Sequence, residues 1–378
     1  MNAVELATGI VFGSSPVPLP ATPLTPRAAL EAAVERALRE RRCFVSFSGG
    51  RDSSVVLATA VAVARREGLP DPIPLTIRAQ RVRESDESDW QESVIAHLGL
   101  ADWIRIEAGD DLDCVGPYAA RALARHGLLW PFNAHFHAPL LEHAAGATLL
   151  TGIGGDELWG SSCAPRTGPR RRLLQAAPRL VRRAVLARRE PIAFPWLRPR
   201  TARRARALAA ADTASVPRAT AGRMAFARGM RYLGTGAGSL ERLASDVDAV
   251  IVHPLLDLEV WGAMAVSAAR KGFATHADAI RAVADDQLPS SLVSRRTKAG
   301  FDGLFFAEHA RAFARSWDGS GVPRDAVDAA ALREHWLGTA PDPHSFLLLQ
   351  AAYLQQRTED WTFVEWRRRS GQPRVRSA

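Results

Sequence analysis

The stretch Ser48-Gly49-Gly50-Arg51-Asp52-Ser53-Ser54 decides the fold. It follows an apolar run at residues 43–47, which we predict to be a strand, and it leads into an apolar helical pattern at residues 53–66. Two glycines let a backbone approach a charged ligand closely, and the start of a helix offers free N–H groups to an anion. The stretch lacks the lysine of the kinase-type P-loop. It therefore predicts a phosphate-binding loop of another kind, the alternative being a glycine turn with a Ser/Asp helix cap.

Short β-rich runs alternate with helical patterns on both sides of this loop. We predict further strands at residues 72–77, 103–106 and 147–150, and helices at residues 27–41, 87–98 and 115–126. Such alternation is typical of βαβ units in a parallel sheet, where ligands bind at the carboxyl ends of the strands. Beyond Gly160 the chain is rich in Arg, Ala and Leu. The sequence therefore predicts an α/β fold: a doubly wound parallel sheet followed by a mainly helical C-terminal half.

A second polar motif follows the fourth expected strand. It reads Thr151-Gly152-Ile153-Gly154-Gly155-Asp156-Glu157-Leu158-Trp159-Gly160. The carboxyl ends of parallel strands meet at one edge of a sheet, so Asp156 is expected near Asp52, and two carboxylates there can hold Mg²⁺. The alternative is that Asp156 and Glu157 form an exposed acidic pair at the start of a helix.

Both motifs resemble those of known enzymes. Residues 48–54 resemble the pyrophosphate-binding loop of the ATP pyrophosphatases (PP-loop enzymes), which cleave ATP between its α- and β-phosphates. Residues 151–160 resemble a stretch shared by asparagine synthetases, β-lactam synthetases and lasso-peptide cyclases. Later segments resemble the same family in the same order: His253-Pro254-Leu255-Leu256-Asp257, Ile280-Arg281, Leu288-Pro289 and Arg296-Thr297-Lys298-Ala299-Gly300-Phe301. The resemblance covers roughly residues 40 to 310.

The resemblance implies the cofactors ATP and Mg²⁺, with Asp52 and Asp156 as the metal ligands. It implies that Lys298, with Arg296 beside it, stabilises negative charge on the transferring phosphate. Only two of the 49 basic residues are lysines, Lys271 and Lys298, and against such a bias a lysine indicates a need for a compact ammonium. The expected nucleotide contacts are Ser48, Gly49, Gly50, Asp52, Ser53, Ser54, Ile77 and Gly152.

Three positions and one spacing depart from the family pattern. Arg51 replaces the usual apolar residue of the loop, and its side chain is expected either to face solvent or to reach a phosphate. Ala277 stands where the synthetases tend to carry a lysine, and Pro289 is one residue further than usual from Lys298. Val250 stands where many of them carry a glutamate that helps to deprotonate the nucleophile. The candidates to replace that glutamate are Asp246, Asp248 and His253.

The implied function is that of an ATP-dependent amide-forming ligase. Such an enzyme adenylates a carboxylate, releases pyrophosphate, and lets an amine or ammonia attack the acyl-adenylate. Glutamine-dependent members carry a catalytic cysteine after the initiator Met, whereas residue 2 here is Asn2. We therefore expect no glutaminase domain, and a nitrogen source in free ammonia, a separate amidotransferase or peptide-binding partner, or the acceptor's own amine. A peptide or small-molecule substrate in natural-product biosynthesis fits, as does an ammonia-using or partner-dependent asparagine synthetase.

Two alternatives belong to other functional classes. The segment 165–206 carries fourteen arginines and one acid, a local charge of +13 in a chain of +9. A tRNA-modifying PP-loop enzyme would use such a segment to bind phosphates, but no paired cysteines for sulfur transfer accompany it, so nucleic acid is not the favoured partner. A non-catalytic nucleotide-binding homologue is the second alternative, suggested by the departures at Arg51, Ala277 and Val250. For the Arg-rich segment itself, a solvated, arginine-coated helical surface is the simpler explanation.

Composition predicts compartment and domain division. The three cysteines, Cys43, Cys114 and Cys163, form no CxxC pair, and no apolar run is long enough to span a bilayer, so we expect a cytoplasmic protein without membrane contact. We predict an irregular lead-in plus a helix at residues 1–40 and an ATP-binding synthetase domain at residues 41–310. A helical C-terminal extension is predicted at residues 311–378, with core-packing aromatics at 346–366 and a disordered tail from 370.

Overall fold

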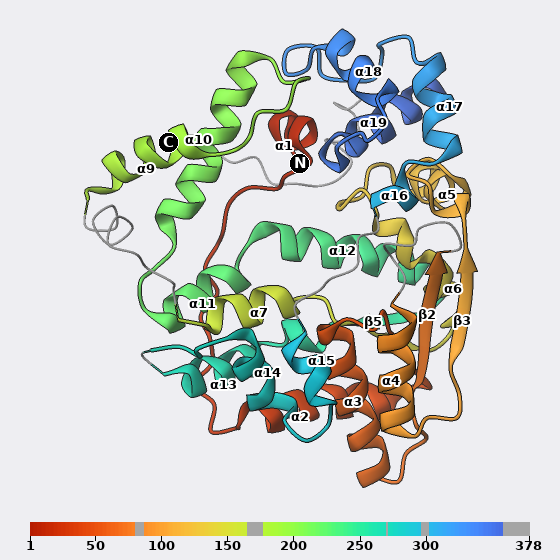
Figure 1. Ribbon diagram of the computed structural model, residues 1–378, viewed down its shortest axis with the longest axis vertical. Coiled ribbons are helices and arrows are strands. Elements are labelled where there is room, and N and C mark those ends of the chain that lie inside the picture. The colour runs from red at the N-terminus through yellow and green to blue at the C-terminus, as the bar shows by residue number, and fades with distance from the viewer. Residues whose placement is uncertain (80–86, 165–176, 270, 296–301, 358–378) are drawn as a thin grey trace.

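The computed structural model describes residues 1–79, 87–164, 177–269, 271–295 and 302–357 (Figure 1). Within these residues one sheet of five parallel strands has the order β3-β2-β1-β4-β5. The strands are β1 Cys43–Ser46, β2 Ile73–Ala79, β3 Ile104–Ala108, β4 Thr148–Leu150 and β5 Val250–Val252. The chain steps outward from β1 to β3 and then returns to the other side of β1. The ligand crevice of such a sheet lies where the order reverses, at the carboxyl ends of β1 and β4.

Helices cover both faces of the sheet because alternate side chains of each strand point to opposite faces. Val45 and Phe47 pack with residues of α2, α3, α13 and α14. Phe44 packs on the other face with residues of α5, α6 and α12. The predicted doubly wound α/β fold is therefore confirmed. These helices are α2 Pro26–Glu40, α3 Arg51–Arg66, α5 Pro117–His126, α6 Ala138–His143, α12 Arg231–Ser245, α13 Leu258–Ala268 and α14 His276–Ala284.

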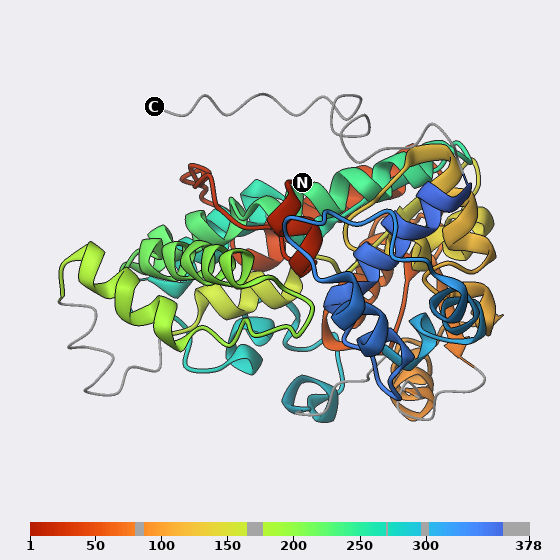
Figure 2. The same cartoon turned by 90° about the horizontal axis from the view of Figure 1, so that it is seen from above.

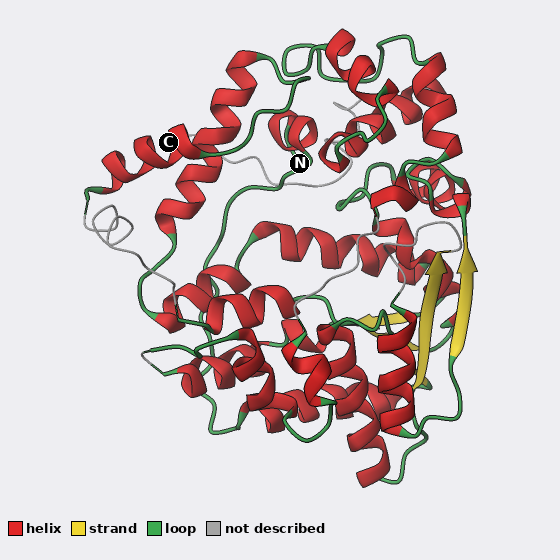
Figure 3. Ribbon diagram, in the orientation of Figure 1, coloured by secondary structure: helices red, strands yellow, loops and turns green. Residues whose placement is uncertain are grey.

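A third core joins the C-terminal helices to the N-terminus. It buries the side chains of Trp196, Trp317, Trp336 and Phe346 together with Leu6. Figure 3 shows this helical part above the strands, which gather at one side of the molecule. The expected core packing of the C-terminal aromatics is confirmed for Phe346, whereas residues 358–378, including the expected disordered tail, lie outside the described residues. The helices of this part are α1 Ala3–Thr8, α10 Pro199–Ser215, α16 Asp302–Phe305, α17 Glu308–Ser316, α18 Ala329–Leu337 and α19 Phe346–Arg357.

The first residues are not uniformly irregular, because α1 lies within the expected lead-in. The Oδ1 atom of Asn2 accepts hydrogen bonds from the backbone N–H groups of Val4 and Glu5, at 2.9 and 3.0 Å. The Glu5 carboxylate accepts one from the N–H of Asn2 in return, at 2.8 Å. Glu5 is buried and pairs with Arg231 at 2.6 Å. This capping box and ion pair stabilise a helix of 6 residues, too short for a periodic pattern.

The described part of the Arg-rich segment contains two helices, joined by a non-helical stretch at residues 190–198. It forms α9 Arg179–Arg189 and the start of α10, and the two helices pack together. Figure 2 shows them at the end of the molecule away from the sheet. Residues 165–176 lie outside the described residues.

The remaining elements connect these layers. They are α4 Ser88–Leu98, α7 Gly155–Ser162, α11 Thr220–Arg228, α15 Ser290–Ser294, and the 3₁₀ turns η2 Asp110–Leu112, η3 Ala134–His137, η4 Pro254–Leu256 and η5 Pro343–Ser345. None of the described helices combines the length and the apolar character needed to cross a bilayer.

Candidate active site

The predicted phosphate loop connects β1 to α3. Gly49 has φ +82°, a backbone conformation that favours glycine, and a Cβ atom there would lie 2.8 Å from Cγ of Gln91. Gly50 is the N-cap of α3 and provides no side-chain cap. The Ser/Asp helix cap considered as an alternative is therefore not what the loop forms. Because no side chain caps the start of α3, the N–H groups of its first turn could bind an anion.

Two serines of the loop are held by each other. Ser48 Oγ lies 3.1 Å from Ser53 Oγ, and the Ser48 N–H donates to Ser53 Oγ at 3.2 Å. The N–H of Gly50 donates to Ser48 Oγ, also at 3.2 Å. Ser53 and Ser54 both donate from Oγ to the Gly50 carbonyl, at 3.1 and 2.8 Å, and both side chains are buried. The loop thus places the hydroxyls of Ser48 and Ser53 side by side and uses that of Ser54 within the helix.

The second motif packs directly on the first. It follows β4, and its glycines permit the approach: a Cβ atom at Gly152 would lie 2.6 Å from the Ser53 nitrogen. A Cβ atom at Gly155 would lie 2.4 Å from Cγ of Asp52. The indole of Trp159 donates a hydrogen bond of 2.7 Å from Nε1 to Oδ1 of Asp52. The two motifs therefore meet at the carboxyl edge of the sheet.

A cavity of about 420 Å³ lies where the motifs meet. Of the expected nucleotide and metal residues, five line it: Ser48, Asp52, Ser53, Gly152 and Asp156. Gly49, Gly50 and Ser54 are not among the residues that line it. Ile77, in β2, packs half-buried against two of the cores rather than lining the cavity. Arg296 and Lys298 lie outside the described residues.

The acidic residues of this cavity are suited to a magnesium ion that is bound jointly by the protein and by the phosphates of a nucleotide. Among the described residues no group of three or more His, Cys, Asp or Glu side chains is placed to hold a metal ion. Asp52 and Asp156 nevertheless line the same cavity. Mg²⁺ is typically bound by one or two carboxylates together with substrate phosphates and water, rather than by an all-protein cage. The donor set therefore suits Mg²⁺ bound with a nucleotide, and the two ligand assignments stay predictions.

The opposite wall of the cavity was not foreseen from any motif. It comes from the segment around η3 and from α12, and it contributes Trp130, Phe136, Tyr232, Leu233 and Leu240. The Tyr232 hydroxyl donates to Oε1 of Glu157 at 2.7 Å, and its ring centroid lies 5.9 Å from that of Trp130. Burial, reinforced by Glu157, raises the pKa of Tyr232, so this phenol stays protonated.

Two histidines lie beside the cavity in their neutral form. His253, after β5, has Nδ1 2.6 Å from Thr151 Oγ1, and His137 of η3 lines the cavity wall. Burial lowers the pKa of each to about 4; the imidazole of His137 adds to this effect on His253, and that of His135 adds to it on His137. Among the described residues, Nδ1 of His137 and Nε2 of His253 are buried without a hydrogen-bond partner.

This placement separates the three candidates to replace the missing glutamate. Val250 is the first residue of β5, so the carboxyl end of that strand is next to His253. Asp246 and Asp248 precede the strand; Asp246 pairs with His126 at 2.8 Å, and Asp248 lies 3.6 Å from Arg41. Both therefore lie at the amino end of β5, and His253 alone of the three lies at the edge where the motifs meet.

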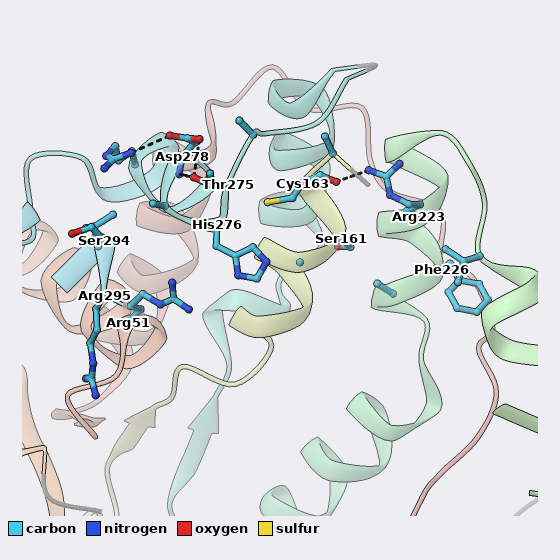
Figure 4. A pocket seen from close by; sticks show the side chains of 18 of the residues that line it. Arg51, Ser161, Cys163, Arg223, Phe226, Thr275, His276, Asp278, Ser294 and Arg295 are labelled. Carbon is cyan, nitrogen blue, oxygen red and sulfur yellow. Dashed lines mark hydrogen bonds and ion pairs between the residues drawn. The ribbon is translucent and has the colours of Figure 1, made fainter. Parts of the chain in front are cut away.

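A second, larger cavity of about 1220 Å³ receives the side chain of Arg51 (Figure 4). Arg223 and His276 line it as well, and Ala277 is part of its wall. Arg281, also in the lining, is paired with Asp278 at 3.0 Å. The side chain of Arg51 forms no hydrogen bond or ion pair with another described residue. Arg51 thus lines a basic cavity next to the loop, not the cavity that holds Asp52.

The comparison with protein families agrees with these motifs. The family model described as asparagine synthase matches residues 25–361. The chain therefore belongs to the asparagine synthase family, whose members are ATP-dependent amide ligases. The match extends beyond both ends of the predicted domain at residues 41–310, and the predicted division into domains stays a prediction. No curated protein sequence matches the chain.

Proposed function

We propose that this protein is an AMP-forming ligase that activates a carboxylate by adenylation and joins it to an amine or ammonia. The observation that supports it best is the packing of Gly155 and Trp159 against Asp52, which brings Asp52 and Asp156 into one cavity. A carboxylate oxygen of the substrate attacks the α-phosphorus of ATP, the bond to the β-phosphate oxygen breaks, and pyrophosphate leaves. The amine then attacks the acyl carbon, AMP departs, and the amine loses a proton.

The chain's own residues supply positioning and charge in this proposal. Ser48 and Ser53 donate hydroxyl hydrogen bonds to phosphate oxygens, and the start of α3 favours negative charge there. Asp52 and Asp156 would hold Mg²⁺, which would offset the negative charge of the phosphates. Lys298 and Arg296 are proposed to stabilise the charge that develops during transfer, for which a preorganised donor contributes about 3 kcal/mol. His253 or His137, neutral at pH 7, accepts the proton from the amine.

The wall of the cavity favours an apolar or aromatic acyl group over free aspartate. No arginine or lysine is among the described residues that line the cavity, and Trp130, Phe136 and Leu240 are. Aspartate carries a second carboxylate that a site would pair with a cation. A peptide or small-molecule natural-product substrate therefore fits better than asparagine synthesis from ammonia, which is the alternative. We place the reaction in the cytoplasm, in keeping with three buried free cysteines.

Enzymatic assays test the proposal directly. The protein is incubated with Mg²⁺, ATP, hydroxylamine and a panel of carboxylic acids and acidic peptides, and AMP release is measured. We expect AMP with some members of the panel, and ATP–pyrophosphate exchange with the same acids. Asp52→Ala and Lys298→Ala are expected to abolish the exchange, whereas Gln355→Met, an exposed change in α19, leaves it unaltered. Undiminished exchange in both site variants contradicts the proposed mechanism, and ADP in place of AMP contradicts the reaction type.

Two other functions make different predictions. A tRNA-modifying enzyme would bind RNA with an affinity that falls steeply as salt rises, through α9 and α10. A non-catalytic homologue would bind ATP without releasing AMP. The same incubation, with an RNA-binding titration beside it, separates them.

A further inference from the structure

Three successive carbonyl groups of the phosphate loop are each held by a side chain from a different element. Thr76 of β2 donates from Oγ1 to the Phe47 carbonyl at 2.7 Å. Gln91 of α4 donates from Nε2 to the Ser48 carbonyl at 3.0 Å. Arg295, which follows α15, reaches the Gly49 carbonyl from Nη1 at 3.5 Å. We call Thr76, Gln91 and Arg295 the carbonyl clamp.

Each member of the carbonyl clamp is itself fixed. Thr76 and Gln91 are buried, and the indole Nε1 of Trp103 donates to Thr76 Oγ1 at 2.9 Å, which leaves the Thr76 hydroxyl hydrogen free for the loop. The guanidinium of Arg295 forms a two-pronged ion pair with Glu87, and both side chains are about 5% exposed (6% and 5%). The same guanidinium lies 4.8 Å from the ring centroid of Trp90. Donors held in this way cannot follow the loop if it moves.

Each of these carbonyl contacts also fixes the direction of an N–H group, because the C=O and the N–H of one peptide unit lie in a rigid plane. Peptide units of the loop are trans, so the N–H of each unit points away from its C=O. Holding the Ser48 carbonyl against Gln91 therefore turns the Gly49 N–H to the opposite side of the loop. That N–H has no hydrogen-bond partner among the described residues, whereas the neighbouring N–H groups of Ser48 and Gly50 bind serine hydroxyls. An unpartnered donor beside two hydroxyls is suited to an anion.

A pair of glycines needs such a clamp. Glycine has the widest range of backbone conformations, so the peptide unit between Gly49 and Gly50 has little intrinsic resistance to rotation. A rotated unit would present a carbonyl oxygen to the ligand and repel phosphate. Gln91 also occupies the space that a Cβ atom at Gly49 would need. The glycines allow the loop backbone to approach a ligand closely, and the carbonyl clamp fixes the orientation of the loop's peptide units.

We propose that Gln91 is a positioning residue that directs the Gly49 N–H toward an oligophosphate, and that Thr76 and Arg295 are positioning residues for the two flanking peptide units, whose N–H groups hold the Ser53 and Ser48 hydroxyls. This inference rests on the proposed function, because it assumes that the loop binds the β- and γ-phosphates of ATP. The three residues do not touch the ligand. Their effect is therefore specific for the pyrophosphate moiety and absent for a ligand that lacks it.

Calorimetry with three ligands tests the proposal. Binding of Mg·ATP, Mg·pyrophosphate and AMP is measured for the unaltered protein and for Gln91→Met, which keeps the side-chain size and loses the amide donor. We expect at least a tenfold loss of affinity for Mg·ATP and Mg·pyrophosphate, and an AMP affinity within twofold of the original. Gln355→Met makes the same chemical change at an exposed position and is expected to alter none of the three.

A second variant keeps the test decisive if Gln91→Met does not fold. Thr76→Val is isosteric and removes only the hydroxyl donor, and it is expected to show the same selective loss. Unchanged pyrophosphate affinity in the folded variants overturns the proposal, and so does an equal loss for AMP, which would indicate a general structural role. A protein that binds none of the ligands before substitution contradicts the proposed function itself, and the inference falls with it.

Discussion

The indole of Trp159 donates a hydrogen bond to the carboxylate of Asp52, at 2.7 Å from Nε1 to Oδ1. Trp159 is fully buried in the core that covers one face of the sheet. The bond therefore connects the hydrophobic core to the carboxylate that we assign to the metal. It orients one carboxylate oxygen of Asp52 and fixes the distance between the motif at residues 151–160 and the loop at residues 48–54.

Replacing Trp159 with Phe should weaken both stability and nucleotide binding. The change removes a hydrogen bond to a charged group, which costs roughly 1.5–3 kcal/mol of unfolding free energy. Mg·ATP affinity should fall because Asp52 is no longer oriented. Trp196→Phe is the matched control: its buried indole donates to the Ala7 carbonyl at 2.8 Å, in the separate core of the C-terminal helices. It should lower the urea midpoint without changing ATP affinity; equal ATP affinity for Trp159→Phe would contradict this reading.

Gly155→Ala should displace Asp52. The added Cβ atom would lie 2.4 Å from Asp52 Cγ, closer than any van der Waals contact, so α7 or the loop must shift. We expect a loss of about 1–3 kcal/mol in stability, as for overpacking elsewhere, and a loss of Mg·ATP binding. Gly234→Ala, within α12, meets no atom within 4 Å and should instead stabilise by roughly 0.5–1 kcal/mol. Thermal unfolding with and without Mg·ATP distinguishes the two; an unshifted melting temperature for Gly155→Ala refutes the close contact.

Arg295→Met should destabilise the protein through Glu87. Both side chains are nearly inaccessible, so removing the arginine leaves an unpaired buried carboxylate, at a cost of roughly 3–5 kcal/mol. The double variant Arg295→Met, Glu87→Leu removes both charges and should recover much of this loss. Urea denaturation of the two single variants and the double variant measures the coupling. Additive losses would show that the two residues do not interact.

The two neutral histidines predict a loss of stability in mild acid. Burial lowers the pKa of His253 to about 4, whereas an unfolded histidine titrates near pH 6.5. Between these values the unfolded chain binds more protons than the folded one, so unfolding free energy falls as the pH drops through this window. His253→Gln should flatten the change in urea midpoint between pH 7 and pH 4.5, whereas His97→Gln, at an exposed position, should not. If the urea midpoint of His253→Gln changed between pH 7 and pH 4.5 by as much as that of the unaltered protein, the prediction would be contradicted.

Local patterns were sufficient for most of the sheet and for both motifs. The strands at the start of the chain were predicted because apolar runs bounded by polar turns are a local signal. β5 was not predicted, since Val250–Val252 is three residues long and all three are only partly buried. The contribution of Gln91, Tyr232 and His137 was equally invisible, because none of them belongs to a recognisable motif. Their roles come from which helices pack beside the loop.

By itself, the sequence determined the family, the glycine- and serine-rich loop between the first strand and its helix, and the pair of aspartates at two strand ends. These are properties of short segments, since spacing along the chain sets strand, turn and helix. Only the tertiary structure decided that Arg51 lines a separate basic cavity, that an apolar wall from α12 lines the candidate site, and that Gln91 and Arg295 hold the loop from behind. Such contacts join residues far apart in the chain, so they depend on how the helices pack over the sheet.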